Sequence, residues 1–346
     1  VLALINVLPL PPSERGKAFE KLDFVTIGLI VPAMLLVCGV LGVGRYYWWS
    51  DAPWLGWMLA AALPFFATAI LIESHRAKPL LRIDWLASGD IARFAAVAVL
   101  VRLALAEQTY GSVGLLTLGG LDNDQLHTMF LWVALAMVLG IVAACLTLSQ
   151  ERLRLQVMTA ALIIAAGAFI DSGATNLTRP PELYLSQALI GFGTTLFIGP
   201  ALVYGFLRML AKGANHFVTL VVLFSTTQNV GGLAGSALLG SYQVIQTRAH
   251  AASLQDHVLA ADPQVVQRLQ SGTASVAGTI IDPTLRGAEG AALLGQKLVG
   301  EASILAFNDV FRFVAFLALA TAAYLLCRII WIALCVRRSQ AKGVAT

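Results

Sequence analysis

Charged residues are scarce in this sequence, and their scarcity excludes an ordinary water-soluble protein. Only 12% of the 346 residues are Asp, Glu, Lys or Arg, whereas 58% are hydrophobic and the mean hydropathy is +0.79. A soluble domain carries about 25% charged residues to keep its surface in water. The net charge of +4 does not indicate nucleic-acid binding, because the basic residues lie in short segments beside long apolar runs, where they favour lipid headgroups. The composition therefore predicts a membrane protein.

Cysteine is also scarce, and the sequence holds no recognisable metal-binding or catalytic motif. The four cysteines all lie inside apolar runs, where a thiol behaves as a small hydrophobic side chain, so neither a disulfide framework nor a zinc site is predicted. The five histidines are scattered, with no HExxH motif, nucleophile elbow or phosphate-binding glycine loop. We therefore expect no enzyme activity, and a membrane-embedded enzyme remains an alternative class.

Eight apolar runs are each long enough to cross a bilayer as a helix. About 20 apolar residues span a hydrocarbon core of about 30 Å. The runs are continuous rather than alternating, which favours helices over a β-barrel. The sequence thus predicts an all-α polytopic membrane protein with about eight transmembrane helices. The expected spans cover residues 24–44, 54–72, 91–118, 127–148, 157–171, 183–207, 217–239 and 304–336.

Lysines and arginines are concentrated in every second segment between these runs, and therefore on one side of the predicted membrane. Thirteen lie in segments 11–23, 75–90, 149–156 and 208–215 and from residue 336 onward, against two, Arg45 and Arg179, in the opposite short loops. By the positive-inside rule the first set is cytoplasmic, and both ends of the chain lie inside.

Segment 247–301 is expected to be a long external loop with some internal order. Asp262-Pro263 and Asp282-Pro283 each combine an N-cap residue with a proline at the first helical position. Apolar residues at helical spacing follow both pairs, so two short amphipathic helices are predicted in the loop.

The beginning of the chain has an unusual composition. Residues 1–10 are apolar and lead directly into a basic segment, with no initiator Met and no signal-peptide pattern. We expect residues 1–23 to be the end of a preceding span and a cytoplasmic linker, and residues 337–346 to be a cytoplasmic tail.

Three segments together resemble a known family. They are ESHRAKPLL at 73–81, QALIGFG at 187–193 with Pro200 after it, and NVGGLAG at 229–235. Their order and spacing resemble the fourteen-span drug:proton antiporter branch of the major facilitator superfamily, the EmrB/QacA-like exporters. In that family they would correspond to the link after two extra central spans and to parts of the tenth and eleventh core helices.

The resemblance implies an architecture and a function. It implies two extra central helices in 24–74, a cytoplasmic linker in 75–90 and a C-terminal six-helix transport bundle in 91–336. It further implies proton-driven export of an amphipathic drug or toxic organic compound across a bacterial inner membrane, without a cofactor. A periplasmic adaptor with an outer-membrane channel is an implied partner, besides the lipid bilayer and the N-terminal bundle that this sequence lacks. A transport-incompetent fragment or accessory half is the alternative.

Polar residues within the apolar runs are the candidate cavity residues, because such groups are costly in hydrocarbon unless they face a cavity or a partner. Arg102 and Glu107 lie roughly 17 and 24 Å along the third run from Ile91 and on different helix faces, so each needs a separate partner. The expected substrate or proton cavity residues are Glu107, Arg102, Gln108, Tyr110, Thr194, Thr195, Thr226, Gln228 and Asn229.

Each of these residues has a simpler alternative role. Arg102 and Glu107 would be solvated if they lay at the outer mouth, and the hydroxyl and amide groups would serve packing if they bonded neighbouring helices. Gly231 and Gly235 form a GxxxG pair, which is expected to allow close helix contact rather than to touch substrate.

Overall fold

The computed structural model describes residues 20–150, 152–256, 258 and 262–343, with no side-chain description for Ala214 and residues 336–343. Within these ranges the chain forms helices and no strand. The expected end of a preceding span lies outside the described residues, as does most of the linker that follows it. The longer helices are α2 (Lys21–Tyr47), α3 (Pro53–His75), α5 (Gly89–Ala106), α7 (His127–Thr147), α8 (Leu153–Asp171), α9 (Pro180–Leu210), α10 (Phe217–Asp256), α11 (Pro263–Ser275) and α12 (Pro283–Gly343).

Short helical pieces complete the chain path. They are α4 (Ile83–Leu86), the π-helix Glu107–Ser112, α6 (Val113–Leu118) and the 3₁₀ turns Asn123–Leu126 and Ala214–His216.

Seven helices in the described ranges are long and apolar enough to cross a membrane. They coincide with seven of the eight expected spans, so the prediction of a polytopic helical membrane protein is confirmed at this level. The remaining run, 91–118, is helical but is divided into α5, the π-helix and α6, and α5 carries three charged residues, Asp90, Arg93 and Arg102. Because α5 packs against α8, α9, α10 and α12, protein surrounds this run. The count of eight spans stays a prediction.

The expected external loop at 247–301 is mostly helical. Helix α10 continues to Asp256, and α12 begins at Pro283 and runs without interruption to Gly343, through most of the expected tail. Both proline-associated helix starts are present, because the backbone N–H of Gln264 and that of Thr284 donate to Asp262 and Asp282 at 2.8 Å. The second helix is therefore not a separate element. It is the first part of the same helix as the last expected span, since no proline interrupts the chain after Pro283.

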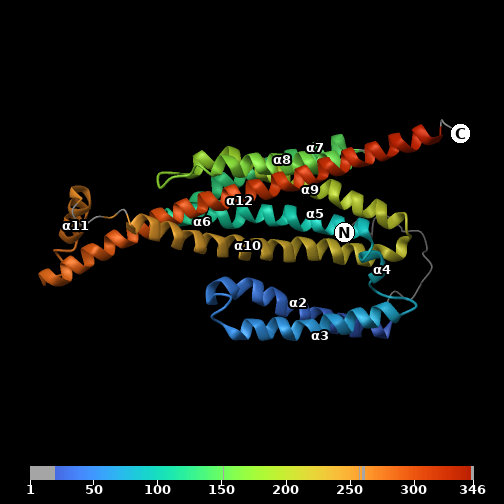
Figure 1. The fold of residues 1–346 in the computed structure, drawn as a ribbon, viewed down its shortest axis with the longest axis horizontal. Coiled ribbons are helices and arrows are strands. Elements are labelled where there is room, and N and C mark those ends of the chain that lie inside the picture. Colours follow the sequence, from blue (N-terminus) through green and yellow to red (C-terminus); the bar gives the residue numbers. More distant parts are fainter. Residues whose placement is uncertain (1–19, 151, 257, 259–261, 344–346) are drawn as a thin grey trace, which may run out of the picture.

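Helices α5 to α10 and α12 form one bundle, and the α2–α3 hairpin lies beside it against α10 (Figure 1). Small side chains such as Ala98, Ala160 and Ala168 fill the core together with larger ones such as Ile164 and Phe197. We refer to the two ends of the bundle as the α11 end, where α11 lies, and the Arg76 end, where α3 leads into α4. The described parts of the lysine- and arginine-rich segments predicted to be cytoplasmic lie at the Arg76 end.

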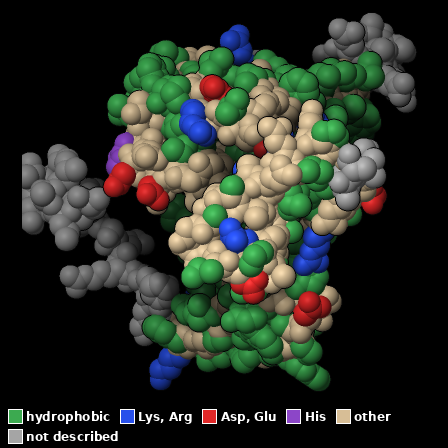
Figure 2. Space-filling model, turned by 90° about the vertical axis from the view of Figure 1, so that its left-hand side faces the viewer, with side chains coloured by type: hydrophobic (Ala, Val, Ile, Leu, Met, Phe, Trp, Pro, Cys, Tyr) green, Lys and Arg blue, Asp and Glu red, His purple; other side chains and the backbone are tan. Residues whose placement is uncertain are grey.

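The sides of the molecule are apolar, as contact with lipid requires. Large hydrophobic side chains are exposed on α2, α3, α7 and α8, among them Leu35, Trp57, Leu131, Leu146 and Phe169. Figure 2 shows the molecule from its α11 end, where hydrophobic side chains gather towards the upper and lower edges of the view and charged side chains are scattered. Exposed apolar surface of this extent would be unfavourable in water, so we interpret it as the surface that faces the bilayer.

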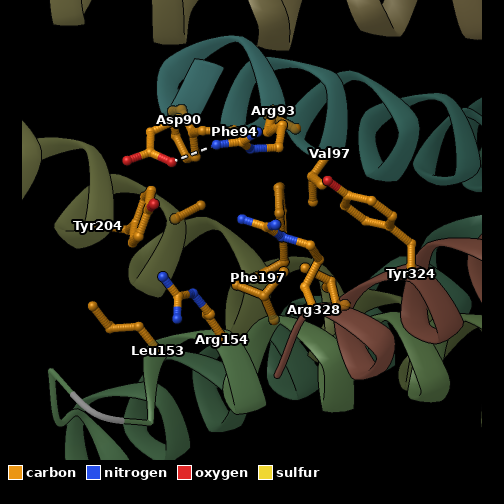
Figure 3. Close-up of a pocket in the computed structure, with 14 residues that line it drawn as sticks. Asp90, Arg93, Phe94, Val97, Leu153, Arg154, Phe197, Tyr204, Tyr324 and Arg328 are labelled. Atoms are coloured by element: carbon orange, nitrogen blue, oxygen red, sulfur yellow. Dashed lines mark hydrogen bonds and ion pairs between the residues drawn. The ribbon is translucent and has the colours of Figure 1, made fainter. Parts of the chain in front are cut away.

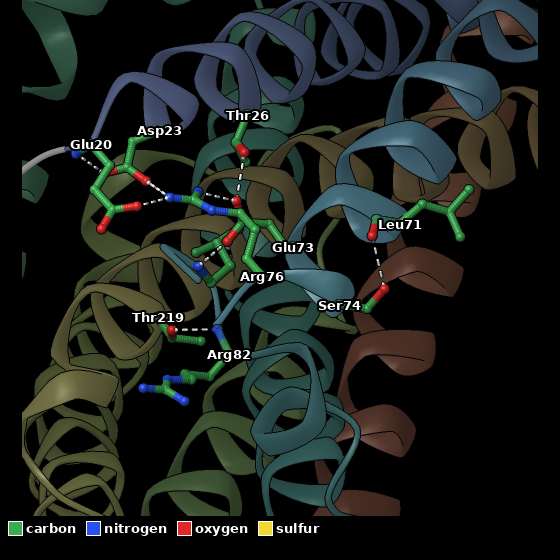
Figure 4. A network of polar contacts seen from close by, with 10 residues as sticks. Glu20, Asp23, Thr26, Leu71, Glu73, Ser74, Arg76, Arg82 and Thr219 are labelled. Carbon is green, nitrogen blue, oxygen red and sulfur yellow. Dashed lines mark hydrogen bonds and ion pairs between the residues drawn. The ribbon is translucent and has the colours of Figure 1, made fainter. Parts of the chain in front are cut away.

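A buried ionic cluster closes the α2–α3 hairpin at the Arg76 end (Figure 4). The Arg76 guanidinium lies 2.8 Å from Asp23, 2.8 Å from Glu73 and 3.2 Å from Glu20. Glu73 also accepts a hydrogen bond from the Thr26 hydroxyl. Although burial lowers the pKa of Arg76, its hydrogen bonds to the three carboxylates raise that pKa above its ordinary value. The cluster thus joins the start of α2 to the end of α3 around one permanent positive charge.

Backbone groups connect the same cluster to the bundle. The N–H of Leu81 donates to Glu73 at 2.9 Å, and the N–H of Arg82 donates to the Thr219 hydroxyl of α10 at 3.0 Å. The segment from Glu73 to Arg82 therefore connects the hairpin to the bundle at this end.

Aromatic and polar contacts hold the hairpin at its other end. The indole N–H of Trp49 donates to the Ser241 hydroxyl of α10 at 2.7 Å. Arg45 lies over the ring of Tyr110 at 4.7 Å from its centroid, a cation–π geometry. The hairpin is thus fastened to the bundle at both ends.

Candidate functional site

The π-helix at Glu107–Ser112 places the most conspicuous polar residue of the bundle. Short π-helices occur mostly within α-helices and frequently at functional sites, because the wider turn redirects side chains. Glu107 is its first residue, and its side chain is 0% exposed. The carboxyl group is directed into the bundle core.

Glu107 belongs to a buried cluster with Gln187 of α9 and Asp171 of α8. The side-chain amide nitrogen of Gln187 donates to Asp171 Oδ2 at 2.7 Å and to Glu107 Oε1 at 3.2 Å. Asp171 is 1% exposed and Gln187 is 0% exposed. We call these three residues the carboxyl pair cluster. One amide nitrogen, with its two hydrogens, therefore bridges two acidic side chains from different helices.

The charge of this cluster is not balanced locally. No Lys, Arg or His in the described ranges forms an ion pair with Glu107 or Asp171. Two acceptor atoms, Asp171 Oδ1 and Gln187 Oε1, are buried without a hydrogen-bond partner among the described residues. A proton on one carboxyl group would reduce the charge and supply a donor for such an acceptor.

Arg102 lies elsewhere, as expected from its position on a different helix face. Its Nε donates to the backbone oxygen of Gln228 in α10 at 3.0 Å. The rest of the guanidinium lies against Gly232, where an added Cβ would come within 2.9 Å of it. Arg102 thus joins α5 to α10 and does not neutralise Glu107.

Gln108 and Tyr110 flank Glu107 in the π-helix and make weaker contacts. The Gln108 amide donates to the backbone oxygen of Gln187 at 3.4 Å, which adds a second link between the π-helix and α9. The Tyr110 hydroxyl donates to Gln243 of α10 at 3.4 Å. The structure therefore gathers Glu107 and Gln108 near one partner and directs Tyr110 to another.

The two threonines of α9 bond to backbone rather than to an open cavity. The Thr194 hydroxyl donates to the carbonyl of Ile190 in its own helix at 2.7 Å. The Thr195 hydroxyl donates to the carbonyl of Met137 in α7 at 2.9 Å. Thr195 thus makes the interhelical contact that was the simpler alternative for this residue.

The polar residues of α10 do not join the carboxyl pair cluster. Thr226 is half-buried, and the Gln228 side-chain nitrogen is buried without a partner among the described residues. Asn229 is exposed and donates to the carbonyl of Ser225 in its own helix at 2.9 Å. The nine predicted cavity residues therefore fall into separate groups.

The two glycines of the GxxxG pair lie where α10 crosses α5. An added Cβ at Gly235 would lie 2.6 Å from the Ala106 Cβ and 3.1 Å from the backbone oxygen of Leu103. At Gly231 it would lie 3.1 Å from Arg102 Cγ. The absence of a side chain at both positions lets the two helices approach closely.

Gly235→Ala is expected to lower the stability of the protein. The new methyl group would overlap the rigid backbone and Cβ of α5, and such overpacking costs about 1–3 kcal/mol. Gly28→Ala in α2 is the matched control, because nothing lies within 4 Å of its added Cβ. Thermal unfolding of the purified protein, followed by circular dichroism, should show a lower midpoint for Gly235→Ala only. Equal midpoints for the two variants would contradict the assigned packing role.

A cavity of about 770 Å³ lies at the α11 end of the bundle. Its walls combine apolar side chains such as Leu118 and Ile304 with charged ones such as Arg268, Lys297 and Glu301. This volume falls in the range that accommodates small organic ligands. None of the nine predicted cavity residues lines it, and none lines the smaller cavity at the Arg76 end. Several of the nine direct their polar groups to helix–helix contacts, as Thr195 does to Met137, and their assignment as substrate or proton cavity residues stays a prediction.

Asp171 and Gln187 were not predicted as site residues. The sequence placed Asp171 at the end of an apolar run and Gln187 in a family-like segment, but nothing in it related either to Glu107. The available signal was the one applied to Glu107, a strongly polar side chain within or beside an apolar run. Packing of α8, α9 and the π-helix supplies the remaining information.

A scan of protein-family models and a search of curated proteins found no match for this chain.

Proposed function

We propose that this chain forms the C-terminal transport bundle and two extra central helices of a proton-coupled exporter of the fourteen-span major facilitator type. The buried carboxyl pair cluster is the observation that carries this proposal. The family-like segments support it, because they fall in α9, in α10 and in the link between hairpin and bundle. The exporter would act in a bacterial inner membrane, with the Arg76 end in the cytoplasm.

The carboxyl pair cluster has the properties of a proton-binding site. Two carboxylates that share one amide and lack a nearby cation repel each other, and burial away from water makes each charge costly. Binding of one proton by the pair removes part of that cost, and release restores it. Proton binding by such a site depends on whether water reaches it. When the site opens to water, hydration of the carboxylates favours the deprotonated pair, and when it closes, the protonated form is favoured.

In the proposed cycle this chain supplies one wall of the transport path. Two bundles rock about a central site, and inward movement of a proton drives outward movement of an amphipathic compound. The cavity at the α11 end is large enough for such a compound, and Leu115, which lines it, lies eight residues beyond Glu107, roughly 12 Å along the helix. We place substrate release at this cavity. The proton gradient is the energy source, so the proposal includes no cofactor and no catalytic chemistry.

Proton-driven uptake in inverted membrane vesicles tests this function. The vesicles should come from bacterial cells that overproduce the protein from its natural gene, so that any preceding segment is included. Ethidium uptake should rise when the vesicle interior is acidified and should stop when a protonophore removes the gradient. Vesicles from the same host without the gene are the control.

Identical uptake in the two vesicle preparations would favour the alternative of an accessory half. The intact mass of the protein from its native membrane, compared with 36.8 kDa for this chain, then distinguishes a separate half from part of a longer transporter. A periplasmic adaptor with an outer-membrane channel, if it acts with this exporter, should be retained with the protein after chemical cross-linking in whole cells.

A further inference from the structure

A small cavity at the Arg76 end of the bundle is lined by cationic side chains (Figure 3). It has a volume of about 90 Å³ and lies among α5, α8, α9 and α12. Liquid water occupies about 30 Å³ per molecule, so the cavity has room for about three waters or for one tetrahedral oxyanion. Its ionisable lining residues are Asp90, Arg93, Arg154 and Arg328.

The single acidic side chain of the cavity is already engaged by two arginines. Asp90 lies 2.7 Å from Arg93 and 3.2 Å from Arg208, with a different carboxylate oxygen in each pair. Arg154 and Arg328 form no ion pair among the described residues, although Arg328 lies over the Trp331 ring at 5.1 Å from its centroid and helps to lower the pKa of Asp90. The cavity walls therefore carry more positive than negative charge.

The side chains of Arg154 and Arg328 both line this cavity. Figure 3 shows Arg154 from α8 and Arg328 from α12 directed into the same cavity from different sides. Two guanidinium groups that face each other repel unless an anion lies between them, and planar guanidinium forks are suited to phosphate oxygens. Arg154 is also in the first turn of α8, where free backbone N–H groups favour an anion.

The position of the cavity fits a ligand at the membrane surface. Helices α5 and α8 begin beside it, and Tyr204 lines it near the end of α9. Tyr204 and Tyr324 add two phenol side chains to its walls. The ends of membrane-spanning helices lie near the lipid headgroups, so a cavity beside several such ends is close to the membrane surface.

We propose that this cavity binds a phosphate group held between Arg154 and Arg328, supplied either by an anionic phospholipid headgroup or by free inorganic phosphate. The bound phosphate joins α8 to α12 across the end of the bundle and offsets the repulsion between the two arginines. This binding site is separate from the carboxyl pair cluster, and the proposal does not depend on the transport function.

Ligand-dependent thermal stability of the purified full chain tests the proposal. Unfolding midpoints would be measured in detergent with increasing short-chain phosphatidylglycerol, phosphatidylcholine or sodium phosphate at constant ionic strength. We expect phosphatidylglycerol or phosphate to raise the midpoint and phosphatidylcholine to have a smaller effect. In Arg154→Gln/Arg328→Gln the half-saturating concentration should rise about tenfold or more, because charge-assisted hydrogen bonds are lost.

Lys78→Gln/Lys212→Gln is the matched control, since it removes two exposed positive charges from the same end of the molecule. Stabilisation by phosphatidylglycerol that free phosphate does not compete away identifies a lipid headgroup as the source. Stabilisation by phosphate alone identifies the free anion.

Two results would overturn the proposal. One is equal stabilisation of the unaltered protein by phosphatidylcholine and phosphatidylglycerol, with no effect of phosphate. The other is an arginine double variant that responds like the lysine control. The first comparison uses the unaltered protein, so it decides the question even if the arginine variant does not fold.

Discussion

Glu107→Gln should abolish proton-driven export while leaving the protein folded. Glutamine is nearly isosteric and retains an oxygen that accepts from Gln187, so the packing of the π-helix against α9 is preserved. It carries no ionisable group, so the cluster retains only Asp171 and loses the carboxyl pair. We expect ethidium transport in inverted vesicles to fall at least about tenfold and to lose its dependence on pH, as removal of an essential proton carrier requires. The unfolding midpoint should be unchanged or higher, because a buried like-charge contact is removed.

Asp171→Asn should have the same effect as Glu107→Gln, since the two carboxyl groups act as a pair. Glu182→Gln is the matched control, because Glu182 is an exposed carboxylate in the first turn of α9. Transport by Glu107→Gln with the activity and pH profile of the unaltered protein would exclude the carboxyl pair cluster as the proton site. Loss of transport in the Glu182 control would show that the assay responds to surface charge rather than to the pair.

Arg76→Ala should cause the largest loss of stability among single substitutions in the α2–α3 hairpin. The Arg76 side chain is 8% exposed and lies between the buried carboxylates of Asp23 and Glu73. Removing one partner of a buried ion pair leaves unpaired charge, and the cost is about 3–5 kcal/mol. Denaturant unfolding of the purified protein at neutral pH should show this loss. The segment from residue 77 to residue 82, which links the hairpin to the bundle, should also become more sensitive to proteolysis.

The pH dependence of Arg76→Ala checks the cause of the destabilisation. Without the guanidinium, the stranded carboxylates are tolerated best when protonated, so the stability of the variant should increase as the pH falls from 8 to 5. The unaltered protein should not share this gain, because its carboxylates are paired. Arg312→Ala is the control, since Arg312 is 55% exposed and its ion pair within the described residues is with Asp309, three residues earlier on its own helix. Such exposed pairs contribute about 0–1 kcal/mol. Equal losses in the two variants would exclude buried charge as the cause.

Local properties of the sequence determined most of the helical architecture. An apolar run of sufficient length must form its backbone hydrogen bonds internally in lipid, so span positions follow from composition alone. The expected spans 24–44 and 127–148 correspond to Lys21–Tyr47 and His127–Thr147. The helix starts at Pro263 and Pro283 were equally predictable, because an N-cap and an N-terminal proline act on adjacent residues.

Tertiary structure decided which polar groups meet. Glu107 and Asp171 lie 64 residues apart, and both bond to Gln187, a contact that depends on which faces of α8, α9 and the π-helix pack together. The same holds for Arg154 and Arg328, which come from different helices and share a cavity. Apolar patterning specifies that a helix lies in the bilayer, but it leaves the neighbour and rotation of that helix open, because lipid and protein interior are both apolar surroundings. The sequence therefore determined which segments form the apolar helices of this protein. The packing of those helices placed Glu107 next to Asp171 and directed Arg154 and Arg328 into one cavity.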